Sequence, residues 1–242
     1  MIISKYFKNP LHPITISLIG VGGTGSLVLP RLARMNFGLK QMGHPGLMVF
    51  SYDDDVVETY NVGRQNFSDC DISKNKAFAI TEKCNLAWGT VWEALPIKYA
   101  LGKNMTSNIH IICVDNAEFR KKYYESSEEL TKKKEPYLSN FFTIDCGNGK
   151  NFGQVIISDS HKQLKNPFDL YPDMINQDNE ETQGMASCSY AESLEKQDMF
   201  INDQISVECV KILWSLFRKE ELNINGVVVN AETNKTLPLK IF

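Results

Sequence analysis

The chain has 242 residues, of which 43% are hydrophobic and 23% charged, values typical of a soluble protein with a sizeable core. Its formal net charge of -3 gives no electrostatic reason to expect nucleic-acid or membrane binding. No apolar run approaches the roughly 18 residues that cross a bilayer, and the N-terminus lacks the apolar segment of a signal peptide. We therefore expect a cytoplasmic protein built as one α/β domain.

The first half of the chain alternates short apolar strands with amphipathic helices. Strands are predicted at residues 14–20, 47–50, 90–97 and 109–114, and helices at 23–35, 73–86 and 117–133. This alternation favours a parallel, doubly wound sheet, in which right-handed crossovers bring the carboxyl ends of the strands to one edge. Gly20, Asp53 and Asp115 end or follow three of these strands, so we expect them at that edge, where such sheets bind ligands.

The second half of the chain contains different elements. We predict strands at 137–143 and 154–158 around a turn-rich piece at 146–151, a crossover loop at 161–196, a helix at 197–218, and a hairpin with strands at 226–230 and 236–239. The expected fold is α/β: a doubly wound, Rossmann-like, mostly parallel sheet with an antiparallel C-terminal extension. We expect a single domain over 1–242, with a nucleotide-binding core at 14–160, the crossover loop, and the C-terminal helix and hairpin at 197–242.

A glycine-rich turn, G-V-G-G-T-G, joins the first strand to the first helix. Gly20 allows a tight turn, Gly22 lets backbone approach a phosphate, and Gly25 lets the helix pack closely on the sheet; Gly23 belongs to the same turn. Backbone N–H groups and the helix dipole at this point favour an anion. The turn therefore predicts a nucleotide site, and a glycine-rich turn without a ligand is the alternative.

The residues after the second strand carry acidic and basic groups in a fixed order. Asp53 closes that strand, where a carboxylate accepts hydrogen bonds from ribose hydroxyls. Its distance from the glycines exceeds the usual ~20 residues, an excess that the loop at 38–46 can absorb. Arg64 and Lys76 follow, and both can bind phosphate oxygens. An exposed acidic turn and two surface cations are the alternative interpretation.

Two further residue types bear on metal binding. Asp115 ends the fourth strand, where a carboxylate suits a Mg²⁺ that bridges phosphates; a helix N-cap is an equally good interpretation. None of the six cysteines belongs to a C-x-x-C pair, so no zinc site is expected. Cys84, Cys113 and Cys209 lie in apolar or helical runs and are predicted to be small buried side chains.

Five motifs occur in a fixed order: G-V-G-G-T-G, D-x-D (Asp53 and Asp55), N-V-G-R-Q (from Asn61), S-K-N-K-A (from Ser73) and C-V-D-N (from Cys113). Together they resemble the adenylation core of the E1-like ThiF/MoeB superfamily, the ubiquitin-activating-type enzymes, over about residues 14 to 160. The resemblance continues more weakly to the C-terminus. The segment at 187–194 looks most like the ThiF-type proteins of bacterial PRTRC gene clusters.

The resemblance implies an activity and a set of roles. Enzymes of this superfamily bind MgATP and join its α-phosphate to the C-terminal glycine carboxylate of a small ubiquitin-like β-grasp protein, releasing pyrophosphate. The implied nucleotide-binding residues are Gly20, Gly22, Gly23, Gly25, Asp53, Asp55, Asn61, Arg64, Gln65, Lys76 and Asn116, with Asp115 as the Mg²⁺ ligand. Arg64, Lys76 and Asp115 are also the implied catalytic residues. Family members pair through the nucleotide domain, so a homodimer is expected.

Cys188 lies where family members place a cysteine before the last long helix, one that accepts the acyl group as a thioester. Against a catalytic role, Glu192 and Glu195 nearby would raise the pKa of its thiol. A structural cysteine or a contact to the substrate tail are the alternatives.

Two departures from the family pattern matter. The zinc-binding cysteine pairs are absent, and no arginine precedes Arg31, whereas many members place an N-terminal arginine in the partner subunit's ATP site. The second departure favours a non-catalytic, nucleotide-binding scaffold as an alternative function. An NAD(P)-dependent oxidoreductase is another alternative, because the glycine turn and Asp53 permit it.

Overall fold

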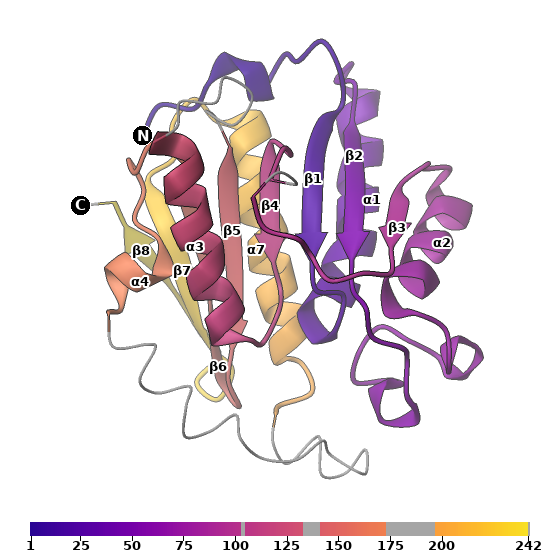
Figure 1. The fold of residues 1–242 in the computed structure, drawn as a ribbon. Coiled ribbons are helices and arrows are strands. Elements are labelled where there is room, and N and C mark those ends of the chain that lie inside the picture. The colour runs from indigo at the N-terminus through magenta and orange to yellow at the C-terminus, as the bar shows by residue number, and fades with distance from the viewer. Residues whose placement is uncertain (103–104, 133–140, 173–196, 242) are drawn as a thin grey trace.

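A computed structural model describes residues 1–102, 105–132, 141–172 and 197–241. One eight-stranded sheet runs through the molecule in the order β3-β2-β1-β4-β5-β6-β7-β8 (Figure 1). The strands are β1 (Ile14–Ile19), β2 (Leu47–Tyr52), β3 (Glu93–Leu95), β4 (Ile109–Ile112), β5 (Phe142–Asn148), β6 (Phe152–Asp159), β7 (Ile224–Asn230) and β8 (Lys235–Lys240). Strands β1 to β5 are parallel, and β6, β7 and β8 extend the sheet antiparallel. The predicted fold class is confirmed.

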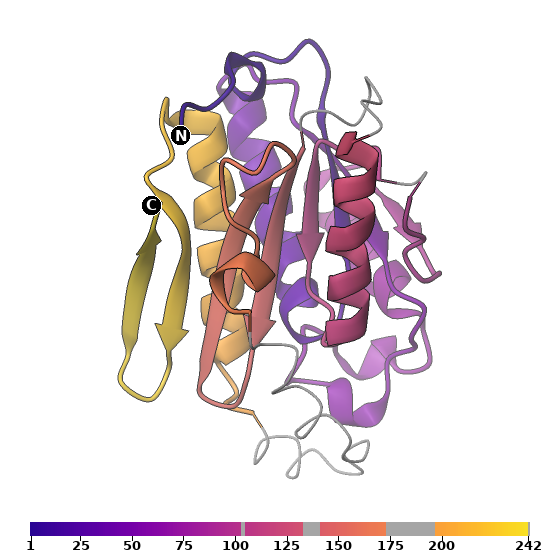
Figure 2. The same ribbon diagram turned by 60° about the vertical axis from the view of Figure 1, so that its left-hand side comes forward.

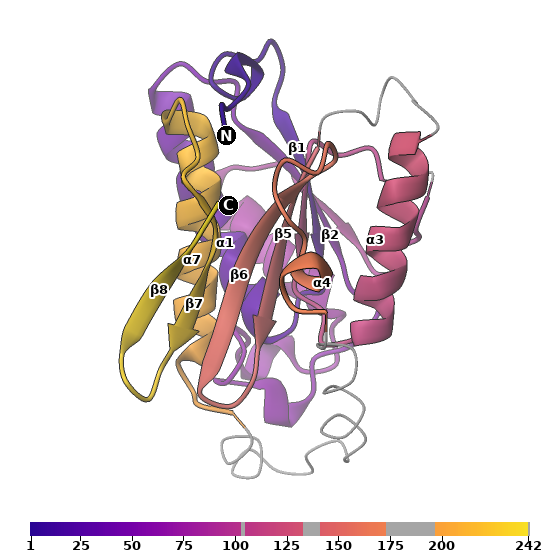
Figure 3. The same ribbon diagram turned by 90° about the vertical axis from the view of Figure 1, so that its left-hand side faces the viewer.

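Helices cover both faces of the sheet. One face carries α1 (Gly23–Gln41), α2 (Lys76–Trp88) and α7 (Ile201–Arg218), and the other carries α3 (Ala117–Lys132) and the short α4 (Pro167–Leu170) (Figures 2 and 3). Right-handed crossovers explain this division, because the chain steps from β1 to β2 to β3 in one direction but from β4 to β5 in the other. Short 3₁₀ turns lie at Lys5–Phe7, Thr59–Asn61 and Asp69–Asp71.

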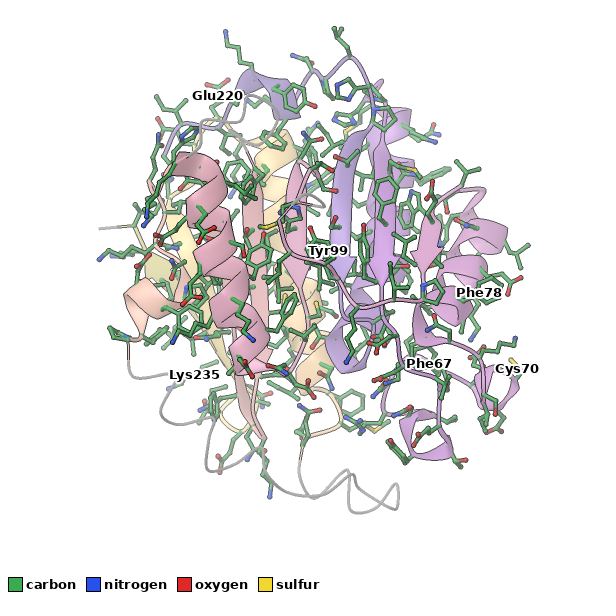
Figure 4. The ribbon with its side chains drawn as sticks, in the orientation of Figure 1. Phe67, Cys70, Phe78, Tyr99, Glu220 and Lys235 are labelled. Atoms are coloured by element: carbon green, nitrogen blue, oxygen red, sulfur yellow. The ribbon has the colours of Figure 1, made fainter. Side chains whose placement is uncertain are left out.

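Each face has its own core. The aliphatic core lies under α1, α2 and α7 and includes Ile14, Ile16, Leu18, Leu29, Leu32, Ile109, Ile111, Ile144, Val155, Ile205 and Leu213. The aromatic core lies on the α3 face and consists of Ile19, Tyr99, Met105, Ile112, Tyr123, Tyr124 and Phe141. Figure 4 shows Tyr99 over the middle of the sheet, whereas Phe78 of α2 lies at the periphery and is half exposed. Among the described residues, no helix is long and apolar enough to cross a membrane.

One imidazole lies inside the aromatic core. His110 of β4 is fully buried, and the rings of Tyr99, Tyr123 and Phe141 have their centroids within 6.2 Å of it. Neither of its ring nitrogens has a hydrogen-bond partner in the described part of the chain. Burial lowers its pKa to about 3, so the ring is neutral at physiological pH.

The sequence pattern predicted most of these elements, but the fifth strand was placed wrongly. Instead of 137–143, β5 occupies Phe142–Asn148, and residues 133–140 lie outside the described ranges. Gly147 and Asn148, which suggested a turn, continue the pairing with Gln154 and Gly153, so the turn is confined to residues 149–151. Helix α1 is also longer than predicted, which shortens the loop before β2, and it contains Pro30.

Candidate functional site

The glycine turn at residues 20–25 packs the end of β1 closely against α1. A Cβ on Gly25 would lie 2.0 Å from the carbonyl oxygen of Gly20, and one on Gly23 would lie 2.9 Å from the side-chain amide of Asn202. Gly20 has a φ of +86°, and a Cβ there would meet Val114. These three glycines are therefore required by internal packing. Gly22 differs, because among the described residues the only atom within 4 Å of its Cβ position is Gln65 Oε1, at 4.0 Å.

Asp53 lies directly against this turn. Its Oδ2 accepts the backbone N–H of Val21 at 2.6 Å, and its Oδ1 accepts that of Asp55 at 3.0 Å. Burial raises the pKa of Asp53, and these two N–H groups oppose the rise. The long sequence interval between glycines and carboxylate is therefore compatible with a shared site, and each carboxylate oxygen keeps acceptor capacity for another hydroxyl donor.

Lys76 opens α2 beside the same strand end. Its Nζ lies 2.8 Å from Asp55 Oδ2, and its backbone N–H donates to the carbonyl of Asp55 at 2.9 Å. The side-chain amide of Asn75 donates to the carbonyls of Asp53 and Asp55 at 2.8 and 3.0 Å, and its oxygen caps α2 by accepting the N–H of Phe78. The S-K-N-K-A and D-x-D motifs are thus joined by hydrogen bonds.

The N-V-G-R-Q motif forms a loop that docks on the first turn of α1. Asn61 is buried and accepts the N–H of Glu58 through its Oδ1, so it shapes the loop. Asn66 donates from its backbone and its side chain to Ser26 of α1 at 3.0 and 3.1 Å. Phe67, labelled in Figure 4, anchors the loop in the aliphatic core.

Gln65, in the same loop, is 7% exposed. Its Oε1 is buried without a hydrogen-bond partner among the described residues, and it faces the open side of Gly22. A buried carbonyl oxygen without a donor is costly. A ligand hydroxyl or amine at this point would satisfy it, which fits a nucleotide bound at the turn.

Arg64 reaches the start of α7 through two amides. Its Nη1 donates to Gln197 Oε1 at 3.1 Å, and the same oxygen accepts from Asn202 Nδ2 at 3.0 Å. Asn202 in turn accepts from Thr24 of α1 and from Asn148 of β5, both at 2.9 Å. Sequence reasoning did not identify Gln197 or Asn202, because neither belongs to a recognisable motif.

Asp115 and Asn116 stand at the end of β4, and both are exposed. Asn116 caps α3, since its Oδ1 accepts the N–H of Phe119 at 2.9 Å. The sequence pattern allowed Asp115 to be the helix cap, but Asn116 has that role. The carboxylate of Asp115 makes no hydrogen bond or ion pair with any residue that the structure describes. It therefore remains available to a ligand.

A buried ion pair supports the chain just before Asp115. Arg120 of α3 bonds to Asp145 of β5, to the carbonyl of Val114, and to the carbonyl of Cys146 at 2.8 Å. Arg120 and Asp145 are 8% and 2% exposed. Burial raises the pKa of Asp145 to about 6, although the guanidinium opposes the rise. No motif predicted that these distant charges would meet.

The oxygen ligands that Mg²⁺ prefers occur in two places at this edge. The carboxylates of Asp53, Asp54 and Asp55 bring their oxygens within 4.8 Å of one another. They fit a cation poorly, because backbone N–H groups hold Asp53 and lysines lie near Asp54 and Asp55. Asp115 has no such partner in the described chain and fits the ion better.

Two other features lie apart from this edge or outside the described chain. A cavity of about 250 Å³ between α3, α4 and the strands β5 and β6 is lined by none of the predicted site residues.

Cys188 lies outside the described residues, so its thioester role stays a prediction. Cys84 and Cys209 are buried as predicted, and Cys113 is partly buried. Burial raises the pKa of the Cys84 thiol to about 12, which makes it a poor nucleophile.

Comparisons with known proteins give no match to a protein-family model and no similar curated sequence. Solved structures do share the fold. Escherichia coli MccB crystallised with ATP aligns with a TM-score of 0.63 at 15% identity, over 96% of this chain and 64% of that one. MccB with MccA-N7isoASN gives 0.63 at 14%, over 94% and 64%. PaaA gives 0.58 at 14%, over 95% and 64%.

These likenesses extend over nearly all of this chain but under two thirds of the matched chains. At such low identity they establish the three-dimensional fold and leave the activity open. The chain therefore has the Rossmann-like fold of MccB and PaaA, with its glycine turn, Asp53, Lys76 and Asp115 placed along the carboxyl edge of the parallel strands.

Proposed function

We propose that this chain is an E1-like adenylating enzyme that binds MgATP and adenylates the C-terminal carboxylate of a small ubiquitin-like β-grasp protein. The observation that carries the proposal is the meeting of D-x-D and S-K-N-K-A beside the glycine turn, through the bonds of Asp53 to Val21 and of Lys76 to Asp55. The fold likeness to MccB, which has been crystallised with ATP, supports it.

Each side chain has a role that its contacts suit. Asp53 is fixed by two backbone N–H groups and would accept the ribose hydroxyls. The buried Oε1 of Gln65, which has no partner among the described residues, would accept a hydrogen bond from the nucleotide beside Gly22. Arg64 and Lys76 would bind the phosphates, and Asn61 would keep the loop that carries Arg64 in shape. Asp55 and Asn116 would complete the site, with Asp55 orienting Lys76 through its ion pair.

The proposed reaction forms one bond to the α-phosphorus and breaks another. An oxygen of the substrate carboxylate forms a bond to the α-phosphorus, the bond from that phosphorus to the bridging oxygen breaks, and pyrophosphate leaves with the electron pair. Cations held near the leaving group stabilise the charge that grows there. Mg²⁺, when bound, would neutralise phosphate charge, and Asp115 is the residue that would hold it.

Several finer assignments belong to this proposal. The activated acyl group would pass to Cys188 as a thioester, with AMP as the leaving group. The protein would act in the cytoplasm as a homodimer, without zinc, and would be closest to the ThiF-type proteins of PRTRC gene clusters. A nucleotide-binding scaffold without activity is the second candidate, favoured by the absence of arginine before Arg31. An NAD(P)-dependent oxidoreductase is the third, although it gives Arg64 and Lys76 no necessary role.

ATP–pyrophosphate exchange with the β-grasp partner tests the proposal. We expect exchange by the wild type and a loss of at least ~100-fold in Lys76→Ala, the size of effect seen when one charge-stabilising group is removed. Lys74→Ala is the matched control, because Lys74 is exposed two residues away. Thermal stabilisation by MgATP without exchange would select the scaffold, stabilisation by NADH would select the oxidoreductase, and no response to any nucleotide would refute all three.

A further inference from the structure

A chain of neutral amides connects the C-terminal helix to the proposed phosphate-binding arginine. Asn202, in the first turn of α7, is 1% exposed. It bonds to Thr24, Asn148 and Gln197, which come from three separate parts of the chain, and Gln197 bonds to Arg64. Gln197 also donates to the carbonyl of Gly149 at 3.4 Å. We call Arg64, Gln197 and Asn202 the amide relay.

The direction of every hydrogen bond in the amide relay follows from Arg64. A guanidinium can only donate, so Gln197 must present its oxygen to Arg64. That oxygen also receives the bond from Asn202, which must therefore turn its NH₂ group toward Gln197. The oxygen of Asn202 is left for Thr24 and Asn148. A single orientation of both amides thus satisfies the relay.

The amide relay differs from the ion pair of the neighbouring lysine. Lys76 lies against the carboxylate of Asp55, which offsets its charge. Gln197 is neutral, so it orients the guanidinium of Arg64 without neutralising it. The contact with Gln197 therefore takes nothing from the attraction between Arg64 and an anion at the edge of the sheet.

We propose that Asn202 and Gln197 are positioning residues that hold Arg64 in place to bind the nucleotide phosphates. This inference rests on the proposed function, since it assumes a polyphosphate at the carboxyl edge. A purely structural role for Asn202 is the competing interpretation, because the residue also joins α1 to α7. That junction has a second tie, the ion pair between Arg31 and Asp203 at 2.9 Å.

Two isosteric variants separate these interpretations. Asn202→Asp replaces the NH₂ donor that faces Gln197 by a carboxylate oxygen, which can only accept. The side-chain oxygen of Gln197 then loses its bond to residue 202 and is no longer held toward Arg64. Gln197→Glu keeps the acceptor but adds a negative charge against Arg64. We expect each to weaken binding of Mg²⁺ and the ATP analogue AMPCPP by ~10-fold in calorimetry, Asn202→Asp because Arg64 loses its fixed acceptor and Gln197→Glu because the added charge offsets that of Arg64.

Controls distinguish positioning from general damage. Asn225→Asp is the matched control. Asn225 is 3% exposed, and three hydrogen bonds with backbone groups hold it near the amino ends of the parallel strands, away from the candidate site. It should lower stability but leave analogue affinity within ~2-fold. In an Arg64→Ala background, Asn202→Asp should add less than ~2-fold, since the relay acts through Arg64. If Asn202→Asp does not fold, the Gln197→Glu and Gln197→Ala variants carry the same comparison.

The outcomes are separable from those of the proposed function. If the wild type binds no analogue, the proposed function fails and this inference with it. If the wild type binds and Lys76→Ala weakens binding, but the relay variants leave affinity unchanged, the inference alone is wrong. An equal loss with Asn202→Asp in both the wild-type and Arg64→Ala backgrounds would also overturn it, because Asn202 would then act independently of Arg64.

Discussion

The α1 face of the sheet is packed mainly by aliphatic side chains, whereas the α3 face alternates aromatic rings with polar groups. Strand β1 illustrates the difference, because Ile16 and Leu18 enter the aliphatic core while Thr15 and Ser17 bond to Asn108 and Ser107 on the other side at 2.9 Å. The α3 face also holds His110 and the pair of Arg120 with Asp145. We infer that the aliphatic side chains of the first face supply stability that does not depend on pH, whereas the buried charges and the imidazole of the second make its contribution depend on pH.

Removing the arginine of the buried pair should have the largest effect on this comparison. Arg120→Met leaves Asp145 buried without its cation, and breaking such a pair costs about 3–5 kcal/mol. Urea unfolding at pH 8 measures the loss. Adding Asp145→Leu should restore most of the stability, because an apolar pair needs no counter-charge. If the double variant is no more stable than Arg120→Met, the uncompensated carboxylate is not the cause.

A truncation in the aliphatic core should have the next largest effect. Leu29→Ala in α1, at a position with no exposed surface, should cost about 3 kcal/mol of unfolding free energy through lost burial and the cavity left behind. The loss should be the same at pH 5 and pH 8, since the side chain carries no titratable group. A loss that changes with pH would contradict the proposed division between the faces.

Replacing the buried imidazole should have the smallest effect and the clearest pH dependence. The pKa of His110 is lowered to about 3 in the folded protein, against about 6.5 in an unfolded chain. Between these values only the unfolded chain takes up the proton, so stability falls as the pH drops below about 6.5. By pH 5 the deficit reaches about 2 kcal/mol.

His110→Leu should therefore gain about 2 kcal/mol over the wild type at pH 5 relative to the difference between them at pH 8. Urea titrations of both proteins at the two pH values measure this change. The comparison cancels the contribution of Asp145, which is present in both chains. An identical difference at pH 5 and pH 8 would show that the imidazole does not titrate as its burial requires.

Local patterns predicted the parts of the fold that depend on neighbouring residues. Alternating strands and helices gave the parallel sheet, and the glycines gave the turn beside Asp53. The error at β5 arose because Gly147 and Asn148 favour turns locally, whereas pairing with β6 keeps them extended.

The missed residues of the candidate site have a common explanation. Asn202, Gln197 and the pair of Arg120 with Asp145 act through partners far away in the sequence. Nothing in the residues around an isolated asparagine or arginine specifies such a partner. Asp53, Lys76 and Asp115 could be named as candidates because each lies in a short motif, but only the packed structure could show the contact of Arg64 with Gln197.

The bond between Thr24 and Asn202 joins residues 178 positions apart. A ribosome that adds ~5–20 residues per second makes the second of these residues roughly 10 to 35 s after the first. The glycine turn and its carboxylate therefore leave the ribosome well before α7 can support them. During synthesis the carboxyl edge of the parallel strands therefore lacks its contact with α7 until residue 202 has been made, although its first residues are among the earliest.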